Sequence, residues 1–102
     1  MTKVAVTRAR LNTSPFIQKS ITISLMITNT SASHIYDMTL TDCVDTYGFF
    51  DSYSFNEGSA VLFYEGNKYI LTANKAENEI TLGGIFVPPR ASVFVFYSFS
   101  LH

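Results

Sequence analysis

The stretch that decides the fold class is Ser20-Ile21-Thr22-Ile23-Ser24-Leu25-Met26-Ile27-Thr28. Aliphatic side chains occupy every second position from Ile21 to Ile27, with Ser, Thr and Met between them. Successive side chains of a strand point to opposite faces of a sheet, so this period of two predicts a strand with one buried face. The polar cluster Asn29–Ser33 then predicts a turn, in which the Asn29 side chain bonds its own backbone.

The same alternation recurs on the C-terminal side of this stretch. In Ser92–Leu101 the odd-numbered positions hold Val, Tyr, Phe and Leu, while the even-numbered positions hold Phe and Ser. Gly83-Gly84 predicts a bulge or a close backbone approach, and Pro88–Ser92 interrupts strand pairing because proline has no N–H to donate. We expect the other strands at Ile35–Cys43, 49–55, 60–64, 68–73 and from Ile80, with a tight hairpin turn at 65–67 and a polar loop at 74–78.

These short strands predict one all-β domain. Helical periodicity is not convincing anywhere, and turn signals recur every 8–12 residues or so, which is typical of antiparallel sandwiches. We therefore expect an antiparallel β-sandwich of about seven to eight strands, with residues 1–102 forming a single domain. The chain has no Trp and one Cys, which excludes the antibody type of sandwich.

The composition excludes several classes of partner. The net charge is -1 and only 15% of the residues are charged, so we expect no nucleic acid partner, since phosphate binding requires a basic face. No apolar run approaches the roughly 20 residues that cross a bilayer, so we expect no membrane span. The first eight residues include no apolar core of a signal peptide, so no leader is visible in this chain.

The residue types of catalytic and metal sites are sparse. Cys43 is the single cysteine, and the two histidines are His34 and His102. The acidic residues, among them Asp42 and Asp45, do not follow the spacing of a calcium-binding loop. We therefore expect no catalytic residues, no metal, no cofactor and no enzyme activity.

A family resemblance adds a second line of argument. Between Ile21 and Leu101 the chain carries an ordered set of motifs: Ile21–Thr30, Met38–Asp42, Gly58–Val61, Ile80–Gly83 and Pro89–Val95. This ordered set resembles the conserved bacterial surface repeats that are catalogued as domain of unknown function eleven. The resemblance implies an immunoglobulin-like β-sandwich in secreted and cell-surface proteins, usually in tandem, without catalytic residues.

The chain departs from the pattern of that family at a few positions. Asp45 replaces a usual proline, and Arg90 replaces a usual turn glycine. The segment Tyr47–Phe55 is longer and more aromatic than in the family. Phe94 and Phe96 replace threonines at positions that should face outward, so the departures favour a surface that contacts another molecule.

Phe94 and Phe96 are the first candidate interface. If the odd-numbered residues of the last strand fill the core, these two rings face outward, and burying an aromatic side chain contributes about 1.5–3 kcal/mol. One interpretation is that a partner covers the rings. The alternative is that Tyr47–Phe55 folds over them within the same chain.

The N-terminal segment is the second candidate interface. Residues 3–11 alternate, with Val4 and Val6 on one side of the expected strand. Residues 1–11 are either the ordinary first strand of the sandwich or a strand donated to a neighbouring copy, since an added strand gains main-chain hydrogen bonds and side-chain pockets together.

Two further features are candidates for contacts. Cys43 is expected to face outward at a strand end, where its thiol either links subunits or packs as an inert small residue. The loop that contains Tyr47, Phe49, Phe50 and Tyr53 is a candidate ligand loop for a glycan or a host protein.

These observations together predict a non-catalytic structural module or self-assembling subunit. The expected setting is a bacterial cell-surface, spore-surface or virion appendage, located outside the cell or on its surface, with homo-oligomers or tandem neighbouring domains as partners. The alternative is an adhesin-like binding module that recognises a glycan or a host protein.

Overall fold

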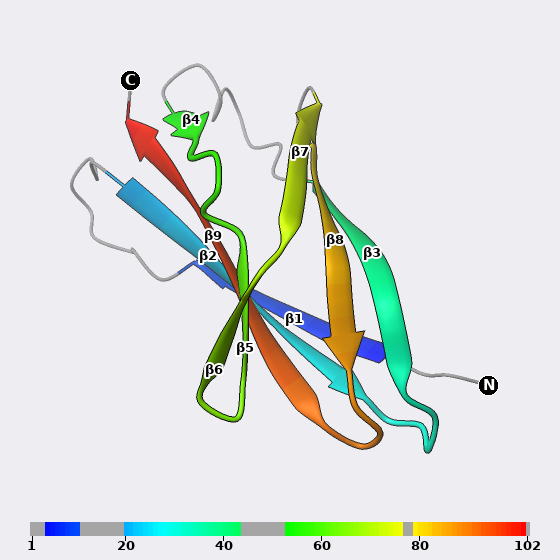
Figure 1. The fold of residues 1–102 in the computed structure, drawn as a ribbon. Coiled ribbons are helices and arrows are strands. Elements are labelled where there is room, and N and C mark those ends of the chain that lie inside the picture. The colour runs from blue at the N-terminus through cyan, green and yellow to red at the C-terminus, as the bar shows by residue number, and fades with distance from the viewer. Residues whose placement is uncertain (1–3, 11–19, 44–52, 77–78, 102) are drawn as a thin grey trace.

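A computed structural model describes residues 4–10, 20–43, 53–76 and 79–101. All regular structure in these ranges is β-strand (Figure 1). The strands are β1 (Val4–Arg10), β2 (Ser20–Asn29), β3 (Ile35–Cys43), β4 (Tyr53–Phe55), β5 (Val61–Tyr64), β6 (Asn67–Ile70), β7 (Thr72–Ala76), β8 (Glu79–Val87) and β9 (Ser92–Leu101). The all-β prediction is confirmed.

The strands form two antiparallel sheets. The larger sheet has the order β1-β2-β9-β5-β6, and β4 also pairs with β9. The smaller sheet has the order β3-β8-β7. The connections from β2 to β3 and from β8 to β9 each lead from one sheet to the other (Figure 1). The chain therefore contributes strands to the two sheets in turn. This is the two-sheet sandwich that the strand pattern predicts.

The strand order places β9 in the middle of the larger sheet. It lies between β2 and β5, and β8 lies beside β3 in the other sheet. In the constant-type immunoglobulin order, the fifth strand occupies the place beside the second. The sandwich architecture is therefore shared with immunoglobulin domains, whereas here the last strand of the chain holds the central position.

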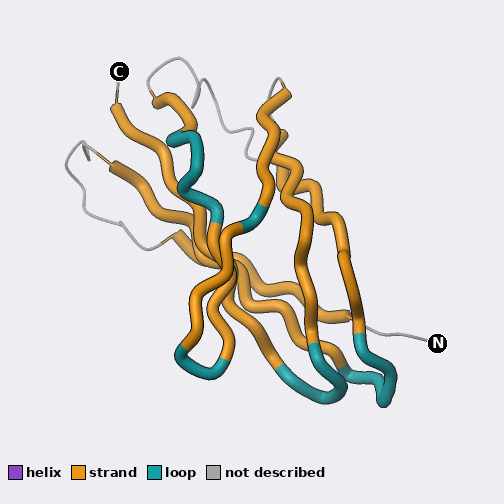
Figure 2. The backbone as a smooth tube through the Cα atoms, in the orientation of Figure 1, coloured by secondary structure: helices purple, strands orange, loops and turns teal. Residues whose placement is uncertain are grey.

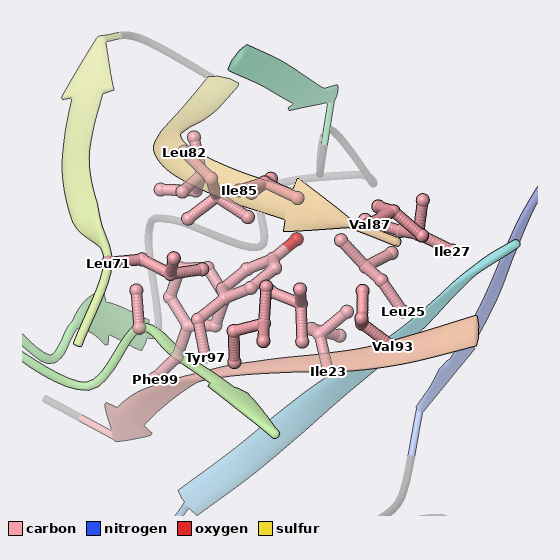
Figure 3. Close-up of a cluster of buried hydrophobic side chains, with 14 of the residues drawn as sticks. Ile23, Leu25, Ile27, Leu71, Leu82, Ile85, Val87, Val93, Tyr97 and Phe99 are labelled. Carbon is pink, nitrogen blue, oxygen red and sulfur yellow. The ribbon is translucent and has the colours of Figure 1, made fainter. Parts of the chain in front are cut away.

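The core lies between the sheets and follows the period of two. Ile27 pairs with Val93 and Leu25 with Val95, and all four side chains are buried. Figure 3 shows the side chains of β2 and β9 pointing toward those of β8. The buried hydrophobic side chains are Ile21, Ile23, Leu25, Ile27, Ala60, Leu62, Leu71, Ile80, Leu82, Ile85, Val87, Val93, Val95, Tyr97 and Phe99.

Two glycines let β8 keep both of its halves facing the core. Ile80 and Leu82 are buried, and so are Ile85 and Val87, although the second pair has the opposite parity. The pairing of β8 with β3 shifts register at this point, and Gly84 has a φ of 83°. A Cβ on Gly83 would lie 2.6 Å from Oγ1 of Thr72. Of the two predicted alternatives the bulge is confirmed, and the Thr72 side chain also lies close to the backbone of Gly83.

Asn29 joins the β2–β3 and β8–β9 connections, which lie at the same end of the sandwich (Figure 2). Its Oδ1 accepts hydrogen bonds from the backbone N and from Oγ of Ser31, at 2.9 and 2.7 Å. Its Nδ2 donates to the carbonyl oxygens of Ser33 and Val87, at 2.7 and 3.1 Å. The predicted turn around Asn29 is confirmed, and the same side chain also holds the end of β8.

The expected strand 68–73 and the expected loop 74–78 need correction. The extended chain leaves the larger sheet after Ile70, turns at the buried Leu71, and enters the smaller sheet as β7. Asn74–Ala76 therefore continue a strand, in which Asn74 pairs with Thr81 and Ala76 with Glu79. The prediction failed because β7 is an edge strand whose residues are largely exposed, so its polar composition looks like that of a loop.

Candidate interaction surface

The outer face of the larger sheet carries two adjacent rows of apolar side chains. In the first row Met26 pairs with Phe94, and Phe94 pairs with Phe63. In the second row Phe96 pairs with Val61, and Val61 pairs with Ile70. The six side chains lie on the face opposite the core, because their neighbours along each strand point inward. We call these six residues the outer patch.

The outer patch is open to solvent over much of its area. Phe94 is 44% exposed, Met26 and Phe63 are 37% exposed, and Ile70 is 69% exposed. The rings of Phe63 and Phe96 meet edge to face with centroids 5.5 Å apart. This is a preferred geometry for aromatic pairs, so the two rings hold each other in a defined orientation.

Hydroxyl and amide side chains surround the outer patch along the strands. On one side Thr28 and Ser92 share a hydrogen bond of 2.7 Å between their hydroxyls. On the other side Asn56 donates to Oγ of Ser98 at 2.9 Å and accepts from Oγ of Ser100 at 2.8 Å. The outer patch thus has an apolar centre and a polar rim, as protein interfaces do.

The same face is almost uncharged. Among the outward-facing positions of β2, β5, β6 and β9, the one charged side chain is Lys68, which pairs with Phe63 at the sheet edge. A depletion of charge at the centre, together with aromatic enrichment, is the compositional mark of an interface core.

The structure places Phe94 and Phe96 on the outer face, as the parity of the last strand predicts. The alternative covering segment is Tyr47–Phe55, of which residues 53–55 are described. The ring of Phe55 meets those of Tyr97 and Phe99 edge-on or tilted, with centroids 6.3 and 5.7 Å apart, and Tyr53 packs against the core. The described part of this segment therefore covers the core rather than the outer patch.

The other predicted contact residues lie elsewhere. Tyr47, Phe49 and Phe50 lie outside the described residues. Cys43 ends β3 and pairs with Glu79, and its side chain is outside the description. The proposed ligand loop is therefore described only at Tyr53.

The N-terminal strand pairs within the chain. Every residue of β1 has a partner on β2, from Val4 opposite Asn29 to Arg10 opposite Ile23. Val6 lies opposite the fully buried Ile27, yet its own side chain is 44% exposed. The structure thus places Val4 and Val6 at an edge of the larger sheet and apart from Phe94, on the other side of β2.

A polar contact between the sheets lies on the inward face, in addition to the hydrogen bond from Asn29 to Val87. The hydroxyl of Tyr97 donates a hydrogen bond to the Oδ2 of Asp42 on β3. The Tyr97 side chain is 1% exposed, and its oxygen points away from β9 toward the smaller sheet (Figure 3). A buried hydroxyl requires such a partner, so Asp42 and Tyr97 brace the two sheets against each other.

We expect the change Tyr97→Phe to lower the free energy of unfolding by about 1.5–3 kcal/mol, because a hydrogen bond to a charged group contributes about that much. The measurement is urea unfolding followed by circular dichroism. The control is Asp42→Ala alone and combined with Tyr97→Phe. Strictly additive losses in the double variant would show that the two side chains do not act together.

A second aromatic group lies where β5 and β6 meet β8. Phe86 contacts Tyr64 and Tyr69 edge to face, with centroids 6.1 and 4.9 Å apart. A hydrogen bond with Glu65 raises the pKa of the Tyr64 phenol above its ordinary value, and the nearby carboxylate charge adds to the effect.

Sequence reasoning missed four members of the outer patch: Met26, Val61, Phe63 and Ile70. Met26 had the outward parity of its strand, which is a usable signal. Phe63 and Ile70 joined the patch only through the register of β5 with β9 and β6, which the parity of an isolated short strand does not reveal.

The side chains of the outer patch are suited to apolar contact with another surface. The described residues bring together no cluster of three or more His, Cys, Asp or Glu side chains that could hold a metal ion. Within the same ranges, no helix has the length and apolar character needed to span a membrane.

No protein-family model, no curated protein and no solved structure matches this chain. The resemblance to bacterial surface repeats stays a prediction.

Proposed function

We propose that this protein is a non-catalytic structural module that assembles with copies of itself. The observation that carries the proposal is the outer patch, a largely exposed apolar surface on the side of the larger sheet opposite the core. Aromatic rings such as Phe94 gain free energy when they leave water, and a polar rim such as Ser98 and Ser100 fits the margin of an interface.

The setting that we propose is a bacterial cell-surface, spore-surface or virion appendage, outside the cell or on its surface. The sequence resemblance to surface repeats supports this setting, and the sandwich architecture is compatible with it. The proposed partners are further copies or neighbouring domains in tandem.

The test of this function is the mass of the protein in solution. We expect light scattering after size-exclusion chromatography to show a mass above that of one chain that rises with concentration. Negative-stain electron microscopy then shows whether the product is a closed particle or a fibre. Discrete monomers at the highest concentration would contradict the proposal and favour the adhesin-like alternative.

A parallel run with reductant tests the contribution of Cys43. A mass that is the same with and without reductant means that non-covalent contacts hold the assembly, which is the expected result. A mass that falls to one chain only with reductant would mean that a disulfide, and not the outer patch, joins the copies.

A further inference from the structure

The self-assembly proposed above leaves open what covers the outer patch. The patch spans the middle of the larger sheet, where β2, β9, β5 and β6 lie side by side. Sheets pack face to face about 10 Å apart with their strands roughly aligned. Another sheet face is therefore a suitable cover for this apolar sheet face.

Building on the proposed function, we infer that the outer patch packs against the outer patch of a second copy of this chain. Charge is the first argument. A surface that meets its own copy across a two-fold axis brings a charge near that axis close to an identical charge, which costs free energy in an interface. The outer positions of the four strands carry only Lys68, at the margin, so two copies can meet without opposing like charges at the centre.

Symmetry is the second argument. A two-fold axis that runs along β9 places β9 over the partner's β9 and β5 over the partner's β2. Residues in one row then meet the same row of the partner. Phe94 faces its own copy, and Phe63 faces the partner's Met26, a pairing of ring and thioether that is favourable.

The same axis separates the two lysines. Lys68 lies on β6, two strands from β9, so the two copies of this side chain fall on opposite margins of the interface. At about 4.8 Å per strand the separation is about 19 Å, well beyond the screening length of about 8 Å at physiological salt.

Area is the third argument. Five strands span about 24 Å, and β2 and β9 each run ten residues, which is about 34 Å. Because β1, β5 and β6 are shorter, the face offers roughly 600 Å². Stable interfaces bury roughly 600–1,000 Å² on each partner, so one face of this sheet suffices for a standard-sized dimer.

The experiment uses paired charge variants of Phe94 in the full chain. We expect Phe94→Lys and Phe94→Glu each to weaken self-association at least about 100-fold in sedimentation equilibrium. An equimolar mixture of the two variants should recover much of the association, because a lysine then faces a glutamate across the axis. Tyr36→Lys is the matched control, since Tyr36 is 75% exposed on β3 of the other sheet, and it should associate as the unchanged protein does.

The outcomes separate this inference from the proposed function. If the unchanged protein assembles and the Phe94 variants assemble equally well, the inference is wrong while the proposed function stands, and another surface such as the β1 edge makes the contact. If the single variants dissociate and the mixture does not recover, the patch meets something other than its own copy, and the two-fold inference is wrong. Circular dichroism confirms that each variant is folded.

Discussion

Replacing Phe99 by alanine is expected to lower the free energy of unfolding by about 3–5 kcal/mol. The Phe99 side chain is fully buried and meets the rings of Phe55 and Tyr97 edge to face or nearly so. The change removes a large buried ring and leaves a cavity that the neighbouring strands fill only in part. Urea unfolding followed by circular dichroism measures the loss.

Phe94→Ala is the matched control for this prediction. Phe94 lies on the same strand with the opposite parity and is 44% exposed, so its loss should change the stability of the monomer by less than about 1 kcal/mol. Both variants are measured at a concentration at which they are monomeric. Since domain stability is about 5–15 kcal/mol, Phe99→Leu serves as a milder change if the alanine variant fails to fold. Equal losses at Phe94 and Phe99 would contradict the observed parity.

Replacing Asn29 by alanine is expected to lower the free energy of unfolding by about 2–4 kcal/mol. The side chain has no exposed area and makes four hydrogen bonds within the two turns. The change leaves the carbonyl oxygen of Val87 without this donor in a buried setting, and such a loss costs more than a surface hydrogen bond contributes. Thermal and urea unfolding both report the effect.

Thr28→Ala is the control for the Asn29 variant. Thr28 precedes Asn29 on the same strand, and its hydrogen bond with Ser92 lies at the surface. Its loss should therefore cost less than about 1 kcal/mol. If Thr28→Ala and Asn29→Ala destabilise the protein equally, Asn29 does not join the turns in the way its hydrogen bonds indicate.

The variant Asn29→Asp adds a pH dependence to this test. The introduced carboxyl is buried beside the carbonyl oxygens of Ser33 and Val87, so its pKa in the folded state is raised above that in the unfolded state. The folded protein then holds a proton that the unfolded chain releases, and stability falls as pH rises from about 4 to 7. A destabilisation that is constant with pH would contradict burial of this position.

The sequence predicted the long strands better than the short ones. Ile21–Ile27 and Val93–Phe99 alternate over several residues, so each strand identifies its own buried face. Four-residue strands such as Asn67–Ile70 carry too few positions for a period to be distinct. Leu71 is an example. The chain crosses there from the larger sheet to the smaller one, and the position of this crossing depends on how Leu71 packs in the core, so the local sequence does not predict it.

The outward direction of Phe94 and Phe96 followed from the period of two, which is a local property of the chain. The period of two did not predict that these rings form one patch with Met26, Phe63 and Ile70. That grouping depends on which strands lie side by side and in which register. By itself the sequence determined an all-β chain, the buried and exposed sides of its long strands, and the turn at Asn29. Only the tertiary structure decided that β9 lies at the centre of the larger sheet and that the apolar side chains of four strands form one patch. The physical reason is that alternation is set by backbone geometry within a strand, whereas strand order is set by the packing of distant segments on a shared core.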